Sequence, residues 1–242
     1  MNDLIKELEL KVEKLELENK FKNGMISILS HDSKEIFGNF LWLIQAVEQE
    51  TITQEEFFNL LPQIKKDAKK NLQTVQDSTA WIKTQYGAFE IKVDDLMVFD
   101  LFQRLKENYA VPLKEKNIDF YFKGDSNGFL KTDRLLLEFV LDKIFNNAVK
   151  YSSSGQDIYL QYFTDDKETV LSIVDVGTGI GEKYLSTLFT YGNPLFEGTA
   201  GESGVGLSLK IVENFVSLMH GNIKIISSEN KGTTVSIFLP HL

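Results

Sequence analysis

The segment KIFNNAVKYS, near the end of a predicted helix, carries Asn147, then Lys150 three residues later and Tyr151 directly after it. Side chains three and four residues apart are neighbours on a helix surface. An amide oxygen suits a metal ion that bridges phosphates, a lysine suits free phosphate oxygens, and an aromatic ring suits a flat base. On its own the pattern is a weak signal, because two asparagines near a helix end are usually structural.

Asp175 stands in a second segment, IVDVGTGIG, where a predicted strand leads into a glycine turn. Gly177 and Gly179 allow a close approach of the backbone to a ligand, because glycine has no Cβ. A buried carboxylate beside such a turn can accept a hydrogen bond from an exocyclic amine such as that of adenine. A plain strand-turn-helix with a capping aspartate explains the same residues.

A third segment, at 198–207, is a loop of glycines and small residues that runs directly into an amphipathic helix. Such a loop offers backbone N–H groups and a positive helix end to phosphates. The segment matches neither the P-loop nor the Rossmann pattern, since it has no Gly-Lys-Ser/Thr and no parallel strand-turn-helix opening.

His31, one of only three histidines, lies in LSHDSKEI within a long run of heptad-spaced residues. The seam of this run comprises Ile5, Leu8, Val12, Leu15, Asn19, Lys22, Ile26 and Leu29, and continues through Ile36, Phe40, Leu43 and Val47. Isoleucine or valine alternating with leucine favours a parallel two-stranded coiled coil, in which a seam asparagine sets the register. His31 then falls on the outward face, accessible to another domain or protein.

The heptad run predicts one helix that ends near EQETIT and is roughly 70 Å long. Thr53 and Glu56 form a capping-box pattern that predicts a second long helix, which Pro62 should kink. Two such helices make a hairpin, and two hairpins make a dimeric four-helix bundle.

Beyond the hairpin the period changes, and five β-branched or aromatic segments predict strands: IDFYFKG, DIYLQYF, TVLSIVDV, NIKIISSE and TTVSIFLP. Helical stretches lie between them at residues 99–116, 133–152 and 208–221. Helices mixed with a largely antiparallel sheet indicate an α+β sandwich. The expected fold is therefore multidomain, α and then α+β, with a coiled coil at 1–24, a hairpin at 25–88 and a sandwich domain at 92–242.

The composition excludes several classes of protein. A net charge of −9 argues against nucleic-acid binding, and the absence of cysteine excludes disulfides and thiolate metal sites. No apolar run approaches the roughly 18 residues that span a bilayer, and the N-terminus lacks the apolar core of a signal peptide. We expect a cytoplasmic segment, and a membrane-bound sensor upstream of residue 1 is compatible with it.

The order of SHD, NNAVKYS, DVGTGIG, GVGLSLKI and KGTTVSIFLP resembles that of bacterial sensor histidine kinases of two-component systems. The resemblance covers nearly the whole chain, as a dimerisation and phosphotransfer hairpin followed by an ATP-binding domain of the type shared with gyrase, heat-shock chaperones and mismatch-repair ATPases. Each motif is modest alone, but five in this order are highly specific. The resemblance implies a homodimeric protein-histidine kinase that uses ATP and Mg²⁺ and passes the phosphoryl group to an aspartate on the receiver domain of a separate response regulator.

The same resemblance implies roles for individual residues. His31 is the expected phosphoacceptor and Asp32 its neighbouring base, since a carboxylate that accepts the proton of one ring nitrogen makes the other nitrogen more nucleophilic. In the ATP-binding domain it implies that Asn147 holds Mg²⁺, that Lys150 lies near the phosphates and that Tyr151 lies against the base. It implies further that Asp175 binds the adenine amine and that Gly177 and Gly179 line the base pocket. Gly204 and Gly206 would shape the end of the lid, and Thr233 would lie near the base.

Three positions depart from the family pattern. Glu35 and Ile36 stand where these kinases commonly carry a threonine or asparagine and then a proline. A glutamate there adds negative charge where an acyl phosphate would dock, which argues against phosphatase activity more than against kinase activity. Lys143 replaces the first asparagine of the second motif, where related ATPases carry a glutamate base, and this argues against a hydrolytic ATPase. Phosphate contact and surface exposure both remain open for the Lys143 side chain.

Two alternatives remain open at the level of sequence. One is a chaperone-like or mismatch-repair-like ATPase, against which Lys143 and the SHD helix both count. The other is a catalytically degenerate dimeric scaffold that binds nucleotide and a regulator without phosphotransfer. Neither a receiver nor a sensor domain is visible in the chain, so the regulator would be a separate protein and a signal would enter through the coiled coil.

Overall fold

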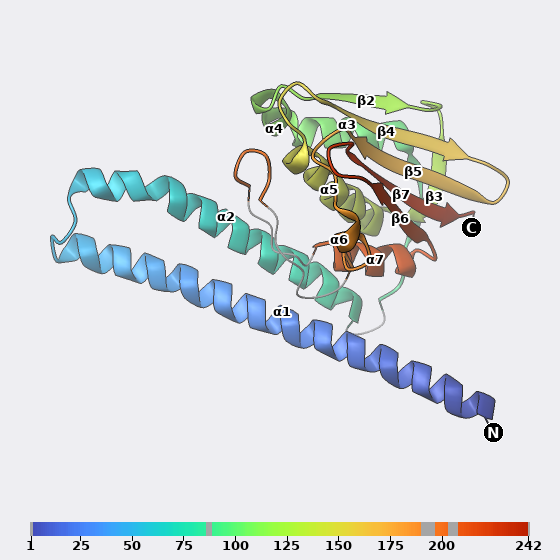
Figure 1. Ribbon diagram of the computed structural model, residues 1–242, viewed down its shortest axis with the longest axis horizontal. Helices are drawn as coiled ribbons and strands as arrows, with labels where there is room; N and C mark the ends of the chain where they lie inside the picture. The colour runs from blue at the N-terminus through green and yellow to red at the C-terminus, as the bar shows by residue number, and fades with distance from the viewer. Residues whose placement is uncertain (1, 86–88, 190–196, 203–207, 242) are drawn as a thin grey trace. The chain divides into compact units, whose positions relative to one another are not determined.

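The chain forms two units, Met1–Gly87 and Ala88–Leu242, in a computed structural model that describes residues 2–85, 89–189, 197–202 and 208–241 (Figure 1). The first unit is helical, and the second combines helices with strands. The predicted fold class, a helical hairpin followed by an α+β sandwich, is confirmed.

The first unit is a hairpin of α1 (Asn2–Glu48) and α2 (Gln54–Gln85), which pack against each other. The predicted capping box is present at the start of α2. The Thr53 amide donates to Glu56 Oε2 at 2.7 Å, and the Glu56 amide donates back to Thr53 Oγ1 at 3.2 Å. Helix α2 continues through Pro62.

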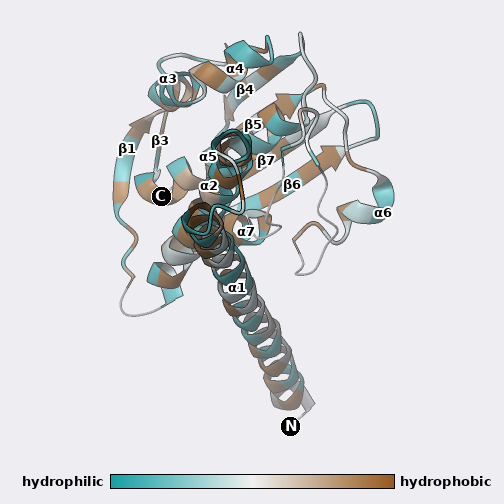
Figure 2. Cartoon of the chain, turned by 90° about the vertical axis from the view of Figure 1, so that its left-hand side faces the viewer, coloured by the Kyte–Doolittle hydropathy of each residue, from teal (hydrophilic) through white to brown (hydrophobic). Residues whose placement is uncertain are grey.

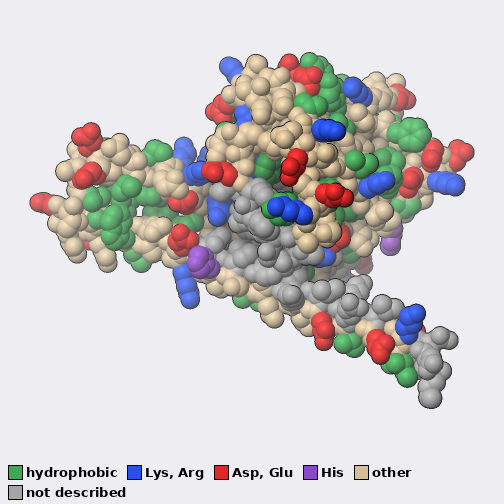
Figure 3. All heavy atoms as spheres, viewed as in Figure 1, with side chains coloured by type: hydrophobic (Ala, Val, Ile, Leu, Met, Phe, Trp, Pro, Cys, Tyr) green, Lys and Arg blue, Asp and Glu red, His purple; other side chains and the backbone are tan. Residues whose placement is uncertain are grey.

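The hairpin carries apolar residues on more than one face. Leu43 and Ala46 are buried, whereas Phe37, Leu41 and Ile44 of the same helix are 67%, 61% and 52% exposed. Hydrophobic and hydrophilic residues alternate along α1 in Figure 2, and hydrophobic side chains gather near the turn between α1 and α2 in Figure 3. A single chain therefore leaves an apolar face of the hairpin in contact with solvent.

The second unit is built on a five-stranded sheet of order β2-β4-β5-β7-β6. The strands are β2 (Asp119–Lys123), β4 (Asp157–Thr164), β5 (Glu168–Asp175), β6 (Asn222–Ser227) and β7 (Thr233–Pro240). All five were predicted, and the sheet is largely antiparallel, since only the β2–β4 pair is parallel. The sequence did not predict a separate antiparallel pair, β1 (Val93–Met97) with β3 (Phe129–Asp133).

Five helices complete this unit within the described residues: α3 (Val98–Asn108), α4 (Ala110–Glu115), α5 (Arg134–Tyr151), α6 (Glu182–Leu185) and α7 (Ser208–Leu218). The single helix expected at 99–116 is wrong, because it is interrupted at Tyr109 between α3 and α4. Pro112 explains the break, since proline has no N–H for the carbonyl four residues earlier and its ring clashes with that carbonyl.

Helices α3, α5 and α7 contact the sheet and hold the core of the unit. Phe120 on β2 packs against Phe102 of α3 and Phe145 of α5, with ring centroids 4.6 Å and 4.3 Å apart. Aromatic pairs at such distances stabilise a core beyond the area that they bury. They fix α5 against the sheet and so define where its C-terminal end lies. Within the described part of the chain, no helix combines the length and apolar character needed to cross a bilayer.

Thr53→Ala should lower the stability of the hairpin by about 1 kcal/mol, because it removes the side-chain half of the capping box. Urea unfolding followed by tryptophan fluorescence measures this directly, since both tryptophans, Trp42 and Trp81, lie in the hairpin. Thr79→Ala, an exposed position inside α2, is the matched control and should not lower the midpoint. Equal midpoints for both variants would contradict the capping role.

Candidate functional site

The C-terminal end of α5 presents the first three predicted site residues. Lys150 is buried, and Asn147 and Tyr151 are partly exposed. The Lys150 Nζ lies 4.6 Å from the centre of the Tyr151 ring, an attractive cation–π geometry. The structure thus brings an amide, a cation and an aromatic ring together on one helical end, as the spacing indicated.

Asp175 is the last residue of β5 and stands opposite Thr233, the first residue of β7. Its Oδ1 accepts hydrogen bonds from the amides of Gly177 at 2.9 Å and Thr233 at 3.1 Å. Its Oδ2 has no hydrogen-bond partner among the described residues. Burial raises the pKa of this carboxyl to about 6, although the two amide hydrogen bonds act in the opposite direction. The second oxygen is therefore available to a donor on a ligand.

The glycine turn after Asp175 is packed against the backbone of two neighbouring segments. A Cβ at Gly177 would overlap the Tyr151 carbonyl, and one at Gly179 would overlap the Ser228 carbonyl. Gly179 also has a φ of +65°, which glycine adopts without strain. The Thr178 amide donates to the Tyr151 carbonyl at 3.1 Å, so the turn is joined to the end of α5. Both glycines thus allow the turn to pack closely against neighbouring protein backbone, and their approach to a ligand stays a prediction.

Ser227 is a residue of this site that the sequence reasoning missed. The Ile180 amide donates to its Oγ at 2.8 Å, and the same oxygen lies 2.9 Å from Thr233 Oγ1. Ser227 therefore ties the glycine turn to the start of β7. The polar run between β6 and β7 signals a turn in the sequence, but nothing in it shows which segment that turn meets.

His31 lies on α1 with its side chain 75% exposed, as the heptad pattern predicted. Its Nδ1 is 3.9 Å from Glu35 Oε2, one helical turn further along. Of Asp32 only the backbone is described, so its role as a base stays a prediction. Gly204 and Gly206 lie outside the described residues.

Lys143 is buried, and its Nζ lies 5.1 Å from the centre of the Phe139 ring and 3.5 Å from Asp142 Oδ2. Of the two environments that the sequence left open for it, phosphate contact and surface exposure, the second is wrong. A protonated lysine in this place cannot activate a water molecule as a carboxylate does.

The described residues contain no group of three or more histidine, aspartate or glutamate side chains that could hold a metal ion by themselves. Mg²⁺ is commonly held by one or two protein oxygens together with substrate phosphates and water. The amide oxygen of Asn147, at the accessible end of α5, fits that requirement.

Comparison with known proteins finds one family model and several curated relatives. Residues 132–242 match the family described as histidine kinase-, DNA gyrase B-, and HSP90-like ATPase. The chain is 23% identical over 241 residues to the sensor histidine kinase YclK of Bacillus subtilis, covering 99% of this chain and 51% of YclK. It is 25% identical over 249 residues to the autoinducer 2 sensor kinase/phosphatase LuxQ of Vibrio vulnificus, covering 98% of this chain and 29% of LuxQ. Residues 132–242 thus carry the ATP-binding domain of this family, and the chain as a whole is similar to sensor histidine kinases.

Solved structures of histidine kinases share the fold. AdeS of Acinetobacter baumannii superimposes with a TM-score of 0.68 at 16% identity, over 87% of this chain and 97% of AdeS. The histidine kinase ThkA, solved in complex with the response regulator protein TrrA, superimposes with a TM-score of 0.72 at 15% identity, over 98% of this chain and 66% of ThkA. The chain spans about half or less of the length of the two curated relatives named above.

The raised pKa of Asp175 predicts a pH dependence of stability in this protein. The folded state holds the proton up to about pH 6, whereas the unfolded chain releases it near its ordinary pKa of 3.8. Stability therefore falls as pH rises through this interval, by about 1 kcal/mol between about pH 5 and pH 7. Urea unfolding of Asp175→Asn, followed by near-ultraviolet circular dichroism, should lack this component. Asp95→Asn, on exposed β1, should retain it, and identical slopes in the two variants would exclude Asp175 as its source.

Proposed function

We propose that this chain is an ATP-dependent protein-histidine kinase that phosphorylates its own His31 and transfers the phosphoryl group to an aspartate of a separate response regulator. The observation that carries the proposal is Asp175, a buried carboxylate with one oxygen held by two backbone amides and the other available to a ligand. The glycine turn follows it, and the Thr178 amide joins that turn to the end of α5.

The base end of the nucleotide would be recognised by Asp175 and Tyr151. With a pKa of about 6, Asp175 is about nine-tenths ionised at pH 7, and an ionised carboxylate is a hydrogen-bond acceptor only. It therefore selects a base that presents a donor amine. The partly exposed ring of Tyr151 offers a flat apolar surface beside it.

The phosphate end would be held by Lys150 and Asn147, within one turn of α5. Lys150 supplies a cation to the phosphate oxygens, and Asn147 supplies an amide oxygen to Mg²⁺. When bound, the metal would neutralise part of the charge on the transferred phosphoryl group. The nucleotide would thus lie along the helix end with its base toward Asp175.

His31 would act through one ring nitrogen while a carboxylate accepts a hydrogen bond from the other. The lone pair of the attacking nitrogen forms the N–P bond, and the bond from the γ-phosphorus to the bridging oxygen breaks and leaves its electron pair on ADP. The remaining ring proton passes to a carboxylate and then to water. Asp32 is the proposed base, and Glu35, 3.9 Å from Nδ1, is a second carboxylate within reach of the ring.

The exposed apolar residues of the hairpin support a homodimer. Phe37, Leu41 and Ile44 recur at spacings of four and three and lie on one face of α1. A second hairpin would cover them and complete a four-helix bundle. We further propose that the signal enters through α1 from a sensor domain or protein upstream, and that the partner in phosphotransfer is a receiver domain.

Incubation with γ-labelled ATP and Mg²⁺ tests the kinase directly. The protein should acquire an acid-labile, alkali-stable label, and His31→Gln should acquire none, because its side chain has no nucleophilic nitrogen. His220→Gln, a histidine outside the site, is the matched control and should be labelled like the parent. Bound nucleotide without label in any of the three proteins would instead indicate a dimeric scaffold.

Phe37→Glu combined with Ile44→Glu should convert the dimer into monomer, because two charges per chain would be buried in the interface. Sedimentation velocity at several protein concentrations measures the change. Asn39→Asp places a negative charge at an exposed position of α1 away from this face and should leave the dimer intact. A monomeric parent protein would exclude the four-helix bundle.

A further inference from the structure

Lys116, directly after α4, has a nearly buried side chain that reaches the C-terminal end of α5. Its side chain is 12% exposed, and its Nζ donates to the carbonyl oxygens of Val149 at 2.9 Å, Lys150 at 2.9 Å and Ser152 at 3.4 Å. The last carbonyls of a helix have no intrahelical donor, and the partial negative charge there favours a cation. Lys116 therefore caps the helix end that carries the nucleotide-site residues.

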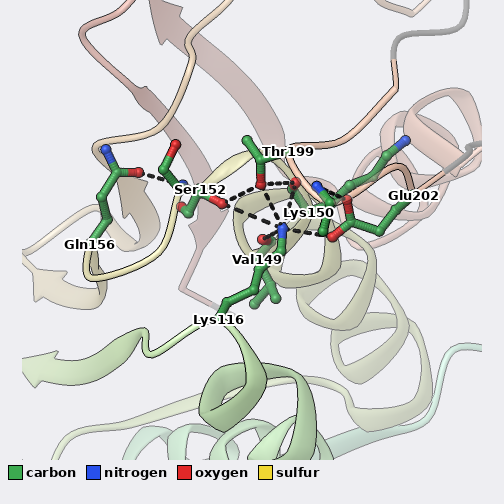
Figure 4. Close-up of polar contacts among 9 residues, drawn as sticks. Lys116, Val149, Lys150, Ser152, Gln156, Thr199 and Glu202 are labelled. Carbon is green, nitrogen blue, oxygen red and sulfur yellow. Dashed lines mark hydrogen bonds and ion pairs between the residues drawn. The ribbon is translucent and has the colours of Figure 1, made fainter.

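The same ammonium group holds a segment far away in the sequence, the turn at 197–202. Lys116 Nζ lies 2.8 Å from Thr199 Oγ1 and 2.6 Å from Glu202 Oε1 (Figure 4). The Thr199 hydroxyl donates to the Ser152 carbonyl at 2.6 Å, and its amide donates to the Lys150 carbonyl at 3.0 Å. Lys116, Thr199 and Glu202 thus form a clamp that fastens this turn to the end of α5.

The turn is also shaped from within by Glu202. Its carbonyl accepts from the Gly198 amide at 2.8 Å, and its Oε2 accepts from the Ala200 amide at 2.8 Å. Because Glu202 both closes the turn and pairs with Lys116, turn geometry and docking depend on the same carboxylate.

Lys150 is directly affected by this arrangement. A Cβ at Gly198 would overlap Lys150 Cγ, so the turn packs against the stem of the lysine side chain. Burial lowers the pKa of Lys150, and the carboxylates of Glu202 and Glu197 oppose that effect. The docked turn therefore touches the stem of Lys150 and brings negative charge close to its ammonium group.

We propose that Lys116, Thr199 and Glu202 are positioning residues for the phosphates of the nucleotide: by holding the 197–202 turn on the end of α5, they fix where the Lys150 ammonium group lies. The inference rests on the proposed function in taking the ligand to be a nucleoside triphosphate. The docking of the turn is independent of that function and can be measured without ligand.

The sharpest variant is Thr199→Val, which keeps size and charge but removes the hydroxyl that Lys116 and Ser152 share. Calorimetry with Mg²⁺ and a non-hydrolysable ATP analogue should show about tenfold weaker binding, whereas adenosine, which lacks phosphates, should bind within about twofold of the parent. In a Lys150→Met background the same substitution should cost less than about twofold, because its effect passes through Lys150. Thr164→Val, at the far end of β4, is the matched control and should bind both ligands like the parent.

Hydrogen exchange without ligand tests the docking itself. The amides of Gly198 and Thr199 should exchange faster in Thr199→Val and in Lys116→Met than in the parent, with the circular dichroism of all three proteins unchanged. Unchanged exchange would overturn the clamp, and faster exchange with unchanged analogue binding would overturn its positioning role. Equal losses for analogue and adenosine would also overturn it, since they indicate general damage. If the parent protein binds neither ligand although exchange responds as expected, the proposed function fails while the docked turn stands.

Discussion

The antiparallel pairing of β5 with β7 is the constraint on which the candidate nucleotide site depends. It sets Asp175 opposite Thr233, so that the amide of one strand holds the carboxylate of the other at 3.1 Å. Because successive side chains of a strand point to opposite faces, a slip of one residue would turn Asp175 away from the site. The glycine turn is attached to this pair through the Gly177 amide, and Ser227 is attached through its hydroxyl oxygen, which lies close to Thr233 Oγ1.

The end of α5 concentrates positive charge, whereas β5 buries a carboxylate. The side chains of Lys116 and Lys150 lie close together there, at a place that little water reaches. The helix dipole and the last carbonyl groups of α5 stabilise one cation, and the carboxylate of Glu202 offsets the charge of both lysines. The candidate site thus has an acidic end, suited to a hydrogen-bond donor, and a basic end, suited to anions. A ligand with both an amine-bearing base and phosphates matches this division.

The sequence predicted much of this arrangement where the signal was local. Asp175, Gly177 and Gly179 are neighbours in the chain, and the three residues of α5 are related by helix periodicity, so their grouping follows from secondary structure alone. The pairing of Lys116 with Glu202 was not predicted, because the two residues are 86 positions apart and only the tertiary fold brings them together. The β1–β3 pair was missed since β1 reads VDDLM, whose adjacent aspartates break the alternation expected of a half-buried strand. Surface exposure was one of the two environments expected for Lys143, but α5 is buried on most of its circumference.

The continuity of α1 has a mechanical consequence. Its backbone is helical without interruption from Asn2 to Glu48. The helix contains no proline, and the first proline of the chain is Pro62 in α2. An α-helix resists twisting about its axis, because each turn is hydrogen-bonded to the next. A rotation applied at the N-terminal end is therefore delivered to His31, about 45 Å away, with little loss. Rotation of α1 about its own axis would therefore set the direction in which the His31 side chain points, and with it the side from which His31 can be reached.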